Sequence, residues 1–304
     1  KVEGDEFEES IDRSTEINRE IPFSPEEIVA KIREAGIVGM GGAGYPTPIK
    51  TKLPEGKKVD CLIINGIECE PFLTADDRLM IEKAEQIVIG AKIINKALGI
   101  QNAIIAIDEN KPRAIEILTK ITKTYIGVNV QVCSTKYPQG GEKQLITAVT
   151  GREVPSGKLP VDAGCLVQNV GTVFAIYEAV MKNKPLFERI VTVSGDACLH
   201  PANYRVRVGT PASFLIEKAG GMTPETAQVI FGGPMMGTSA FNVNAPITKL
   251  TSGILLLSDR LTHKEAEQSC IRCGKCGEVC PMGLQPFRIG QFVRADMLEE
   301  TKEC

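Results

Sequence analysis

The sequence has no strong charge of either sign, no long hydrophobic run and little histidine. Its 35 Lys and Arg residues nearly balance 38 Asp and Glu residues, so the formal net charge is −3 over 304 residues. Binding to a polyanion needs a basic face, and this balance argues against a nucleic acid partner. A bilayer-spanning helix needs about 20 apolar residues, whereas the apolar stretch 87–100 is interrupted by Lys92 and Lys96. We expect no transmembrane segment, and any role at a membrane would go through partners.

The sequence further argues against three features: a signal peptide, a Rieske centre and a hydrolytic active site. Residues 1–23 are acidic and do not read as a signal peptide; we interpret them as a linker or as the remnant of a truncated N-terminal domain. The two histidines, His200 and His263, lack the close pairing with cysteines that a Rieske centre needs. No nucleophile and base stand at a catalytic spacing, so hydrolysis is not predicted.

Cysteine, by contrast, is abundant, and five of the ten cysteines lie in the last 35 residues. The stretch CIRCGKCGEVCP places Cys270, Cys273, Cys276 and Cys280 in the spacing C-x2-C-x2-C-x3-C-P, which ligates a [4Fe-4S] cluster. Zinc sites usually pair two C-x2-C units across a longer gap, which makes zinc the weaker interpretation. In two-cluster ferredoxins the fourth cysteine serves the other cluster. Cys280 therefore either completes this site or serves a second cluster.

The remaining cysteines are scattered singly, mostly in apolar segments. A reduced, buried thiol is the ordinary interpretation of such a residue. This uneven distribution indicates a reducing compartment and a metal cluster rather than a disulfide framework. The scattered residues are Cys61, Cys69, Cys133, Cys165 and Cys198.

A glycine-rich loop, VGMGGAGYPTPIK at 38–50, resembles a dinucleotide-binding turn in part. Gly39, Gly41 and Gly44 fit G-x-G-x-x-G, but that fingerprint should follow a strand and open a helix. Here a capping box at 24–27 and apolar residues at helical spacing predict a helix before the loop. Pro46 and Pro48 disfavour a helix directly after it. The sequence therefore favours a different cradle for a phosphate or a ring.

Short apolar runs alternate with helical segments over residues 24–187, which predicts an α/β domain with a parallel or mixed sheet. Residues 188–260 contain short, turn-bounded apolar runs and one helix at 211–221, which predicts a small β-rich domain. Residues 261–304 are helical sequence interrupted by the cysteine motif. In the first domain we expect strands at 61–66, 103–107 and 128–134, and helices at 79–98, 111–124, 141–150 and 172–183.

Three other stretches place polar residues where a strand ends or a helix begins. Taken singly, each has an ordinary interpretation as a turn, a helix cap or a solvated face. Together with the glycine loop and the cysteine motif they predict a flavin site. The stretches are LIINGIECEPFLTADDR with Asn65, Glu68 and Glu70; KYPQGGEK with Tyr137, Gly140, Gly141 and Glu142; and LVQNVGT with Gln168, Asn169 and Thr172.

Five stretches carry a family resemblance: GMGGAGYPTPIK, INGIECEPFLTADDRLM, YPQGGEKQLITAVTGREVPSG, FGGPMMG and CIRCGKCGEVCPMGLQP. They closely resemble the RnfC subunit of the Rnf-type ion-translocating electron transport complex, over nearly everything from Ser24 to Leu298. More distantly, the first four resemble the flavin-binding, NADH-oxidising subunit of respiratory complex I. The resemblance implies a Rossmann-like flavoprotein domain at 24–187, a β-grasp domain of the soluble-ligand-binding type at 188–260 and a helical, ferredoxin-like iron–sulfur domain at 261–304.

The resemblance also implies FMN at the glycine loop, with NADH above it. Tyr45 would stack on the nicotinamide nucleotide, and Glu70 and Glu142 would accept hydrogen bonds from its ribose hydroxyls. The chain departs from the complex I pattern at Met40, Ile67 and Lys143, which concerns the nucleotide contacts more than the flavin. The residues expected at FMN are Gly41, Gly42, Gly44, Lys50, Asn65, Glu68, Gly140, Asn169 and Thr172.

The family's function implies an oxidoreductase subunit at the cytoplasmic side of the cell membrane, held there peripherally by other subunits. Hydride would pass from NADH to FMN, and electrons would leave through [4Fe-4S] clusters, with ferredoxin reached indirectly and ion translocation coupled by the partners. We expect the chain to be part of a longer protein with a second cysteine run after Cys304.

Two alternatives share part of these motifs. One is a related flavin and iron–sulfur reductase, either a corrin reductase or a proline-reductase-associated carrier. The other is a non-catalytic ligand-binding scaffold, which would require no flavin reducible by NADH.

Overall fold

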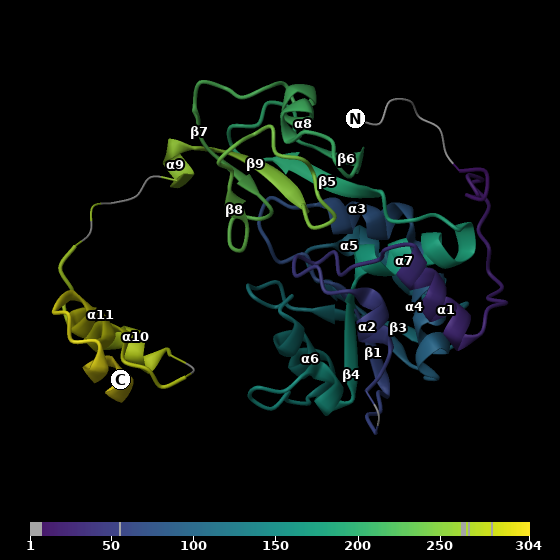
Figure 1. Cartoon of the computed structure of the whole chain (residues 1–304), viewed down its shortest axis with the longest axis horizontal. Coiled ribbons are helices and arrows are strands. Elements are labelled where there is room, and N and C mark those ends of the chain that lie inside the picture. The colour runs from purple at the N-terminus through teal and green to yellow at the C-terminus, as the bar shows by residue number, and fades with distance from the viewer. Residues whose placement is uncertain (1–7, 55, 263–265, 267, 281) are drawn as a thin grey trace. The chain divides into compact units, whose positions relative to one another are not determined.

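The computed structural model describes residues 8–54, 56–262, 266, 268–280 and 282–304 (Figure 1). The chain divides after Thr262 into two compact units. Residues 1–7 of the expected linker, His263, and Pro281 of the cysteine motif lie outside the described residues. Across the described part of the chain, no helix combines the length and the apolar character needed to cross a bilayer.

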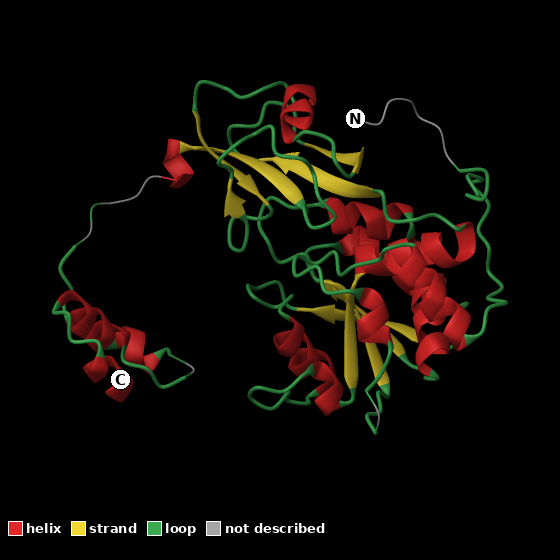
Figure 2. Ribbon diagram, in the orientation of Figure 1, coloured by secondary structure: helices red, strands yellow, loops and turns green. Residues whose placement is uncertain are grey.

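The first sheet contains four parallel strands, β1 (Cys61–Gly66), β2 (Ala103–Asp108), β3 (Val128–Cys133) and β4 (Cys165–Asn169), in the order β3-β2-β1-β4. Figure 2 draws the strands in yellow and the helices in red. The three predicted strands are confirmed. The strand β4 was not predicted, because its five residues run directly into the next helix. From β1 the chain moves outward to β2 and β3 and then returns to the other side of β1. The order therefore reverses between β1 and β4.

Helices cover both faces of this sheet. The larger core joins one face to α1 (Pro25–Glu34), α3 (Ala75–Glu82), α4 (Ala84–Leu98), α5 (Pro112–Thr122) and α7 (Val170–Lys182). On the other face Leu145 and Ile146 of α6 (Glu142–Thr150) pack against Ile63 and Val167. Burial on both faces explains why β1, β2 and the first three residues of β4 are continuous apolar runs. The edge strand β3 (VNVQVC) is less buried and alternates apolar and polar residues.

Two predictions about helices need correction. The single helix expected at 79–98 is two, because the backbone leaves the helical region at Lys83, where φ is −125°. A short helix, α2 (Thr47–Thr51), begins directly after Pro46, although we expected the prolines to disfavour it. Pro48 is tolerated there because the first-turn N–H groups of a helix have no partner within the helix. The predicted capping box of α1 is confirmed, since Glu27 N lies 3.3 Å from Ser24 Oγ and Ser24 N lies 2.7 Å from Glu27 Oε2.

A second sheet follows, with β5 (Glu188–Ser194), β6 (Ala202–Arg207), β7 (Thr226–Phe231), β8 (Thr238–Ser239) and β9 (Gly253–Ser258) in the order β6-β5-β9-β7-β8. The strands β5 and β9 run parallel, while the other neighbours are antiparallel. The helix α8 (Ala212–Lys218) packs Leu215 and Ile216 on this sheet. A hairpin, a helix and a last strand parallel to the first form the expected β-grasp arrangement.

The second unit is small and helical, with α10 (Lys275–Glu278), α11 (Pro286–Arg294) and a 3-10 turn, η2 (Glu299–Glu303). Its last residue is held at the start of α11, where Gln285 N donates to Cys304 O at 2.9 Å. Between 8 and 23 the chain has neither helix nor strand, yet it is held on α7, because Asp12 N donates to Lys182 O at 2.9 Å.

Candidate functional site

Two asparagines lie side by side at the carboxyl ends of β1 and β4, since the register pairs Asn65 with Asn169. The Asn65 amide donates from Nδ2 to Gly140 O at 2.9 Å and accepts at Oδ1 from Ile67 N at 3.1 Å. It therefore joins the turn after β1 to the turn before α6. In open α/β sheets, ligands bind outside the carboxyl ends of the strands where the strand order reverses, and this is that position.

Asn169 is also the N-cap of α7. Its Oδ1 accepts from Gly171 N at 2.9 Å and from Thr172 N at 3.4 Å, and its Nδ2 donates to Asp76 Oδ2 at 2.7 Å. One side chain thus orients the first turns of α7 and α3. The remaining N–H groups and the dipole of α7 favour a negative group at this end.

The glycine loop lies against the start of α7. Met40 N donates to Thr172 Oγ1 at 2.9 Å, and a Cβ added at Gly41 would come within 3.3 Å of Asn169 Cβ. Gly42 has φ of +117°, a conformation that favours glycine. The loop therefore presents bare backbone beside Asn169.

A charged pair at the rim of the site links α2, the helix after the glycine loop, to α6. Lys50 Nζ, from α2, lies 2.5 Å from Glu142 Oε1, at the N-terminus of α6, and both side chains are partly exposed. The structure thereby brings together two residues that the sequence assigned to different ligands. Tyr45, expected on the nucleotide, is half exposed and follows the loop.

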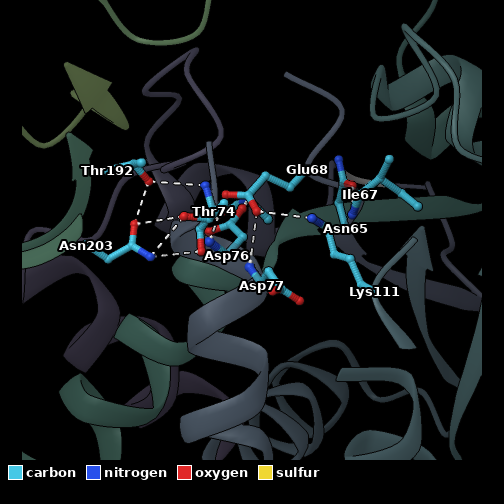
Figure 3. Close-up of polar contacts among 10 residues, drawn as sticks. Asn65, Ile67, Glu68, Thr74, Asp76, Asp77, Lys111, Thr192 and Asn203 are labelled. Carbon is cyan, nitrogen blue, oxygen red and sulfur yellow. Dashed lines mark hydrogen bonds and ion pairs between the residues drawn. The ribbon is translucent and has the colours of Figure 1, made fainter. Parts of the chain in front are cut away.

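The Glu68 carboxylate accepts hydrogen bonds from the first turn of α3 (Figure 3). Its Oε1 accepts from Asp76 N at 2.9 Å, its Oε2 from Asp77 N at 3.2 Å, and Lys111 Nζ lies 3.4 Å from Oε2. Burial, together with the nearby Asp76 charge, raises the pKa of Glu68 to about 7. Burial also raises the pKa of Asp76, while Asn169 and Arg189 oppose that rise.

The β-grasp domain is joined to this edge by two sets of polar contacts. Thr74 N donates to Thr192 Oγ1 at 3.2 Å and Asn203 Nδ2 donates to Thr74 O at 3.3 Å. Dashed lines in Figure 3 mark these contacts. Glu70 accepts from the backbone amides of Met235 and Met236 at 2.9 and 2.8 Å. The Glu70 carboxylate, expected at a ribose, therefore holds the loop between β7 and β8.

A cleft of about 850 Å³ lies along α7, and residues 11–16 form part of its wall. Met40, Asp76 and Asn169 line it, so it reaches the site from the side of the N-terminal segment. Sequence patterns did not indicate this cleft, because its wall is formed by a stretch that reads as a linker.

Three buried polar side chains lie near this edge, and of these only Gln168 was named from the sequence. Asp108, at the end of β2, is 1% exposed, and among the described residues neither of its carboxylate oxygens has a hydrogen-bond partner. Burial raises its pKa to about 6. Gln168 Nε2 and Thr47 Oγ1 are likewise buried and, within the described ranges, without a hydrogen-bond partner. Their positions at strand and helix ends were visible in the sequence, but their burial was not.

Cys270 and Cys273 lie in the loop before α10, Cys276 lies within α10 and Cys280 follows it; the first three are exposed. Arg272 and Gly274 have positive φ, and Arg272 N lies 3.4 Å from Cys270 Sγ. In the part of the chain that the structure describes, no group of three Cys, His, Asp or Glu side chains is gathered closely enough to hold a metal ion.

Comparison with protein families finds two matches. Residues 32–178 match Complex1_51K, the Nuo51 FMN-binding domain. Residues 190–239 match the SLBB domain. The two matches fall on the parallel-sheet domain and the β-grasp domain.

Similar curated proteins are C subunits of ion-translocating complexes. The C subunit of the proton-translocating ferredoxin:NAD(+) oxidoreductase complex of Clostridium ljungdahlii is 48% identical over 92% of this chain and 61% of its own length. The Na(+)-translocating counterpart of Acetobacterium woodii is 45% identical over 89% of this chain and 61% of its own length. The chain thus spans about three fifths of the length of these relatives.

Among solved structures, an NAD+-reducing [NiFe]-hydrogenase in the H2-reduced state matches with a TM-score of 0.65 over 78% of this chain and 47% of that chain. The sequence identity is 21%, so this likeness shows the fold. It agrees with the Rossmann-like and β-grasp arrangement described above.

The unpaired Asp108 generates a prediction about stability. Its pKa is raised above the unfolded value of about 3.9, so stability falls as pH rises from about 4 to 6, and the loss persists above 6. Asp108→Asn should therefore gain about 2 kcal/mol relative to the wild type at pH 7 and little at pH 4. Urea unfolding at both pH values measures this. The exposed neighbour variant Glu109→Gln is the control, and an equal effect of Asp108→Asn at both pH values would contradict the prediction.

Proposed function

The chain is a homologue of the C subunits of ion-translocating oxidoreductase complexes, and on that premise we propose that it binds FMN and NADH and brings electrons into such a complex. The proposal rests on one observation, the bare glycine loop against Asn169 at the carboxyl ends of β1 and β4. This is the position at which an α/β sheet binds a nucleotide-like ligand. We also propose that the complex to which this chain belongs acts on ferredoxin and translocates ions through its other subunits.

The residues present fit a flavin phosphate and its chain. A Cβ at Gly41 would fill the cradle, and the N-terminus of α7 favours an anion. Lys50 supplies a cation at the rim, which Glu142 holds in place until a phosphate competes for it. The unpaired donor of Gln168 and the hydroxyl of Thr47 flank the same loop and helix ends.

Different residues shape the cradle and allow the backbone to approach the ligand. Asn65 and Asn169 fix the turns around the cradle, while Gly42 and Gly44 let the loop approach the ligand. Glu68 and Thr172 support the cradle from behind, because Glu68 holds the first turn of α3 and the buried Thr172 holds Met40 N. Gly140 completes the surface that we propose for the ribityl oxygens. When bound, FMN accepts a hydride as two electrons and releases them singly.

On the nucleotide side we propose Tyr45 as the stacking residue and Glu142 as a ribose acceptor. Glu70 contributes differently from its expected role, because both carboxylate oxygens already hold the backbone at Met235 and Met236. We propose that it shapes the wall of the NADH site by fixing this loop.

The cysteine motif would hold a [4Fe-4S] cluster. Its donor set fits by chemistry, because four thiols with this spacing lie within 11 residues, around the short helix α10 and a preceding loop with positive φ at Arg272 and Gly274. Free thiols persist in a reducing compartment, so we propose a peripheral position on the cytoplasmic side of the membrane, held by the other subunits.

The cation at the rim generates the test of this function. Lys50→Met should weaken FMN binding about tenfold or more, because a charged hydrogen bond to phosphate is worth about 1.5–3 kcal/mol. Lys52→Met, two residues further on and exposed, should bind like the wild type. Titration by flavin fluorescence gives the affinities, and anaerobic addition of NADH should then bleach the flavin absorbance of the wild type. A wild-type chain that binds no FMN, or FMN that NADH leaves oxidised, would overturn the proposal.

The cysteine motif makes a separate prediction. After anaerobic reconstitution the wild type should carry about four iron and four sulfide per chain, and Cys276→Ser should lose most of both. Cys198→Ser, in the β-grasp domain, should keep them. Cys280→Ser decides between its two interpretations: loss of iron assigns it to the local cluster, and retention assigns it to another. Equal iron in the wild type and Cys276→Ser would exclude the cluster.

A further inference from the structure

A pair of thiols lies at the other end of the two strands that carry the site. The register places Cys61, the first residue of β1, opposite Cys165, the first residue of β4. Neighbouring strands are about 4.8 Å apart, within the Cα separation that a disulfide accepts. Both side chains are buried, Cys61 at 8% exposure and Cys165 at 1%.

A surface ion pair covers these thiols. Arg152 Nη1 lies 2.6 Å from Asp60 Oδ1 and Nη2 lies 3.1 Å from Asp60 Oδ2, and both side chains are exposed. The same Nη1 donates to Ala163 O at 3.1 Å and lies 4.0 Å from Cys165 Sγ. Gly164 leaves room for this guanidinium, since a Cβ there would come within 2.9 Å of Nη1. Rotation of two surface side chains would therefore open a path for a small oxidant.

The two thiols are not equivalent. Contact with the Cys61 thiol, aided by the Arg152 charge, lowers the pKa of Cys165 to about 7 against the effect of burial. The Cys165 contact and burial raise the pKa of Cys61. A thiolate is the reactive form of cysteine, and a neighbouring arginine stabilises it.

We propose that Cys61 and Cys165 form a peroxide-oxidisable dithiol, in which Cys165 reacts first and Cys61 closes a disulfide between β1 and β4. In the first step the Cys165 sulfur attacks one peroxide oxygen, the O–O bond breaks, and the leaving hydroxide takes a proton to become water. The product is a sulfenic acid. In the second step Cys61 attacks that sulfur, the S–O bond breaks, and the hydroxide leaves as water with the Cys61 proton. Two thiols are oxidised by two electrons, and one peroxide is reduced to two waters.

The position of this pair connects it to the site. Four residues after Cys61 and Cys165, the same register pairs Asn65 with Asn169. A covalent link at the amino ends would fix the two strands whose carboxyl ends orient the cradle. The dithiol does not depend on the proposed function, because it needs only the two thiols and a peroxide.

Peptide mass spectrometry tests the link directly. The reduced full chain is treated with hydrogen peroxide, denatured in the presence of N-ethylmaleimide and digested with trypsin without reduction. We expect a disulfide between the peptides 59–78 and 159–182, retained in Cys69→Ser, which removes the other thiol of the first peptide. Cys133→Ser should leave the link unchanged, and Cys61→Ser should abolish it. Two alkylated thiols, or an over-oxidised Cys165 without a link, would overturn the proposal.

The pH dependence of the reaction tests the role of Arg152. Link formation in the wild type should rise up to about pH 7 and then level off. In Arg152→Gln it should be about tenfold slower at pH 7 and approach the wild-type rate at higher pH, because less thiolate forms at neutral pH. Arg152→Lys should restore most of the rate. A Gln variant that is slower by the same factor at every pH would contradict a role in thiolate formation.

Discussion

The parallel pairing of β1 with β4 is the constraint on which the rest of the site depends. It sets Asn65 beside Asn169 at one end of the strands, and each amide then holds the turn that follows. Because the chain reaches β4 only after building β2 and β3 on the other side of β1, the strand order reverses here. The loops on the two sides of this point separate and leave room for a ligand.

Buried charged side chains stabilise the start of α3 near the paired asparagines. Glu68 and Asp76 sit at the N-terminus of α3, where backbone N–H groups and the helix dipole favour negative charge. Lys111 and Arg189 lie close enough to offset part of the cost of burial. Since removing one member of such a set leaves a buried charge unpaired, the arrangement strongly favours one orientation of α3.

The apolar strands, the capped helix α1 and the polar residues at the strand ends could be predicted from the sequence, because periodicity and capping are local. The strand β4 was missed because it runs directly into α7. The contacts of Glu70 could not be predicted either, because the amides of Met235 and Met236 lie more than 160 residues away along the chain. The cysteine spacing predicted the [4Fe-4S] cluster and the polar stretches predicted a flavin site, whereas the family resemblance supplied FMN, NADH and the role of each residue at them. Asp108 shows a further limit, since an acid after a strand looks the same whether it is solvated or buried.

Hydrogen exchange with and without FMN tests the central claim most directly, because it locates the ligand on the backbone. The account predicts slower exchange on FMN binding at 39–44, 65–70, 139–142 and 169–172, with residues 11–16 and the part of α7 that lines the cleft, 174–182, unchanged. Protection confined to the cleft along α7, with none in the glycine loop, would contradict the assignment of the cradle between β1 and β4.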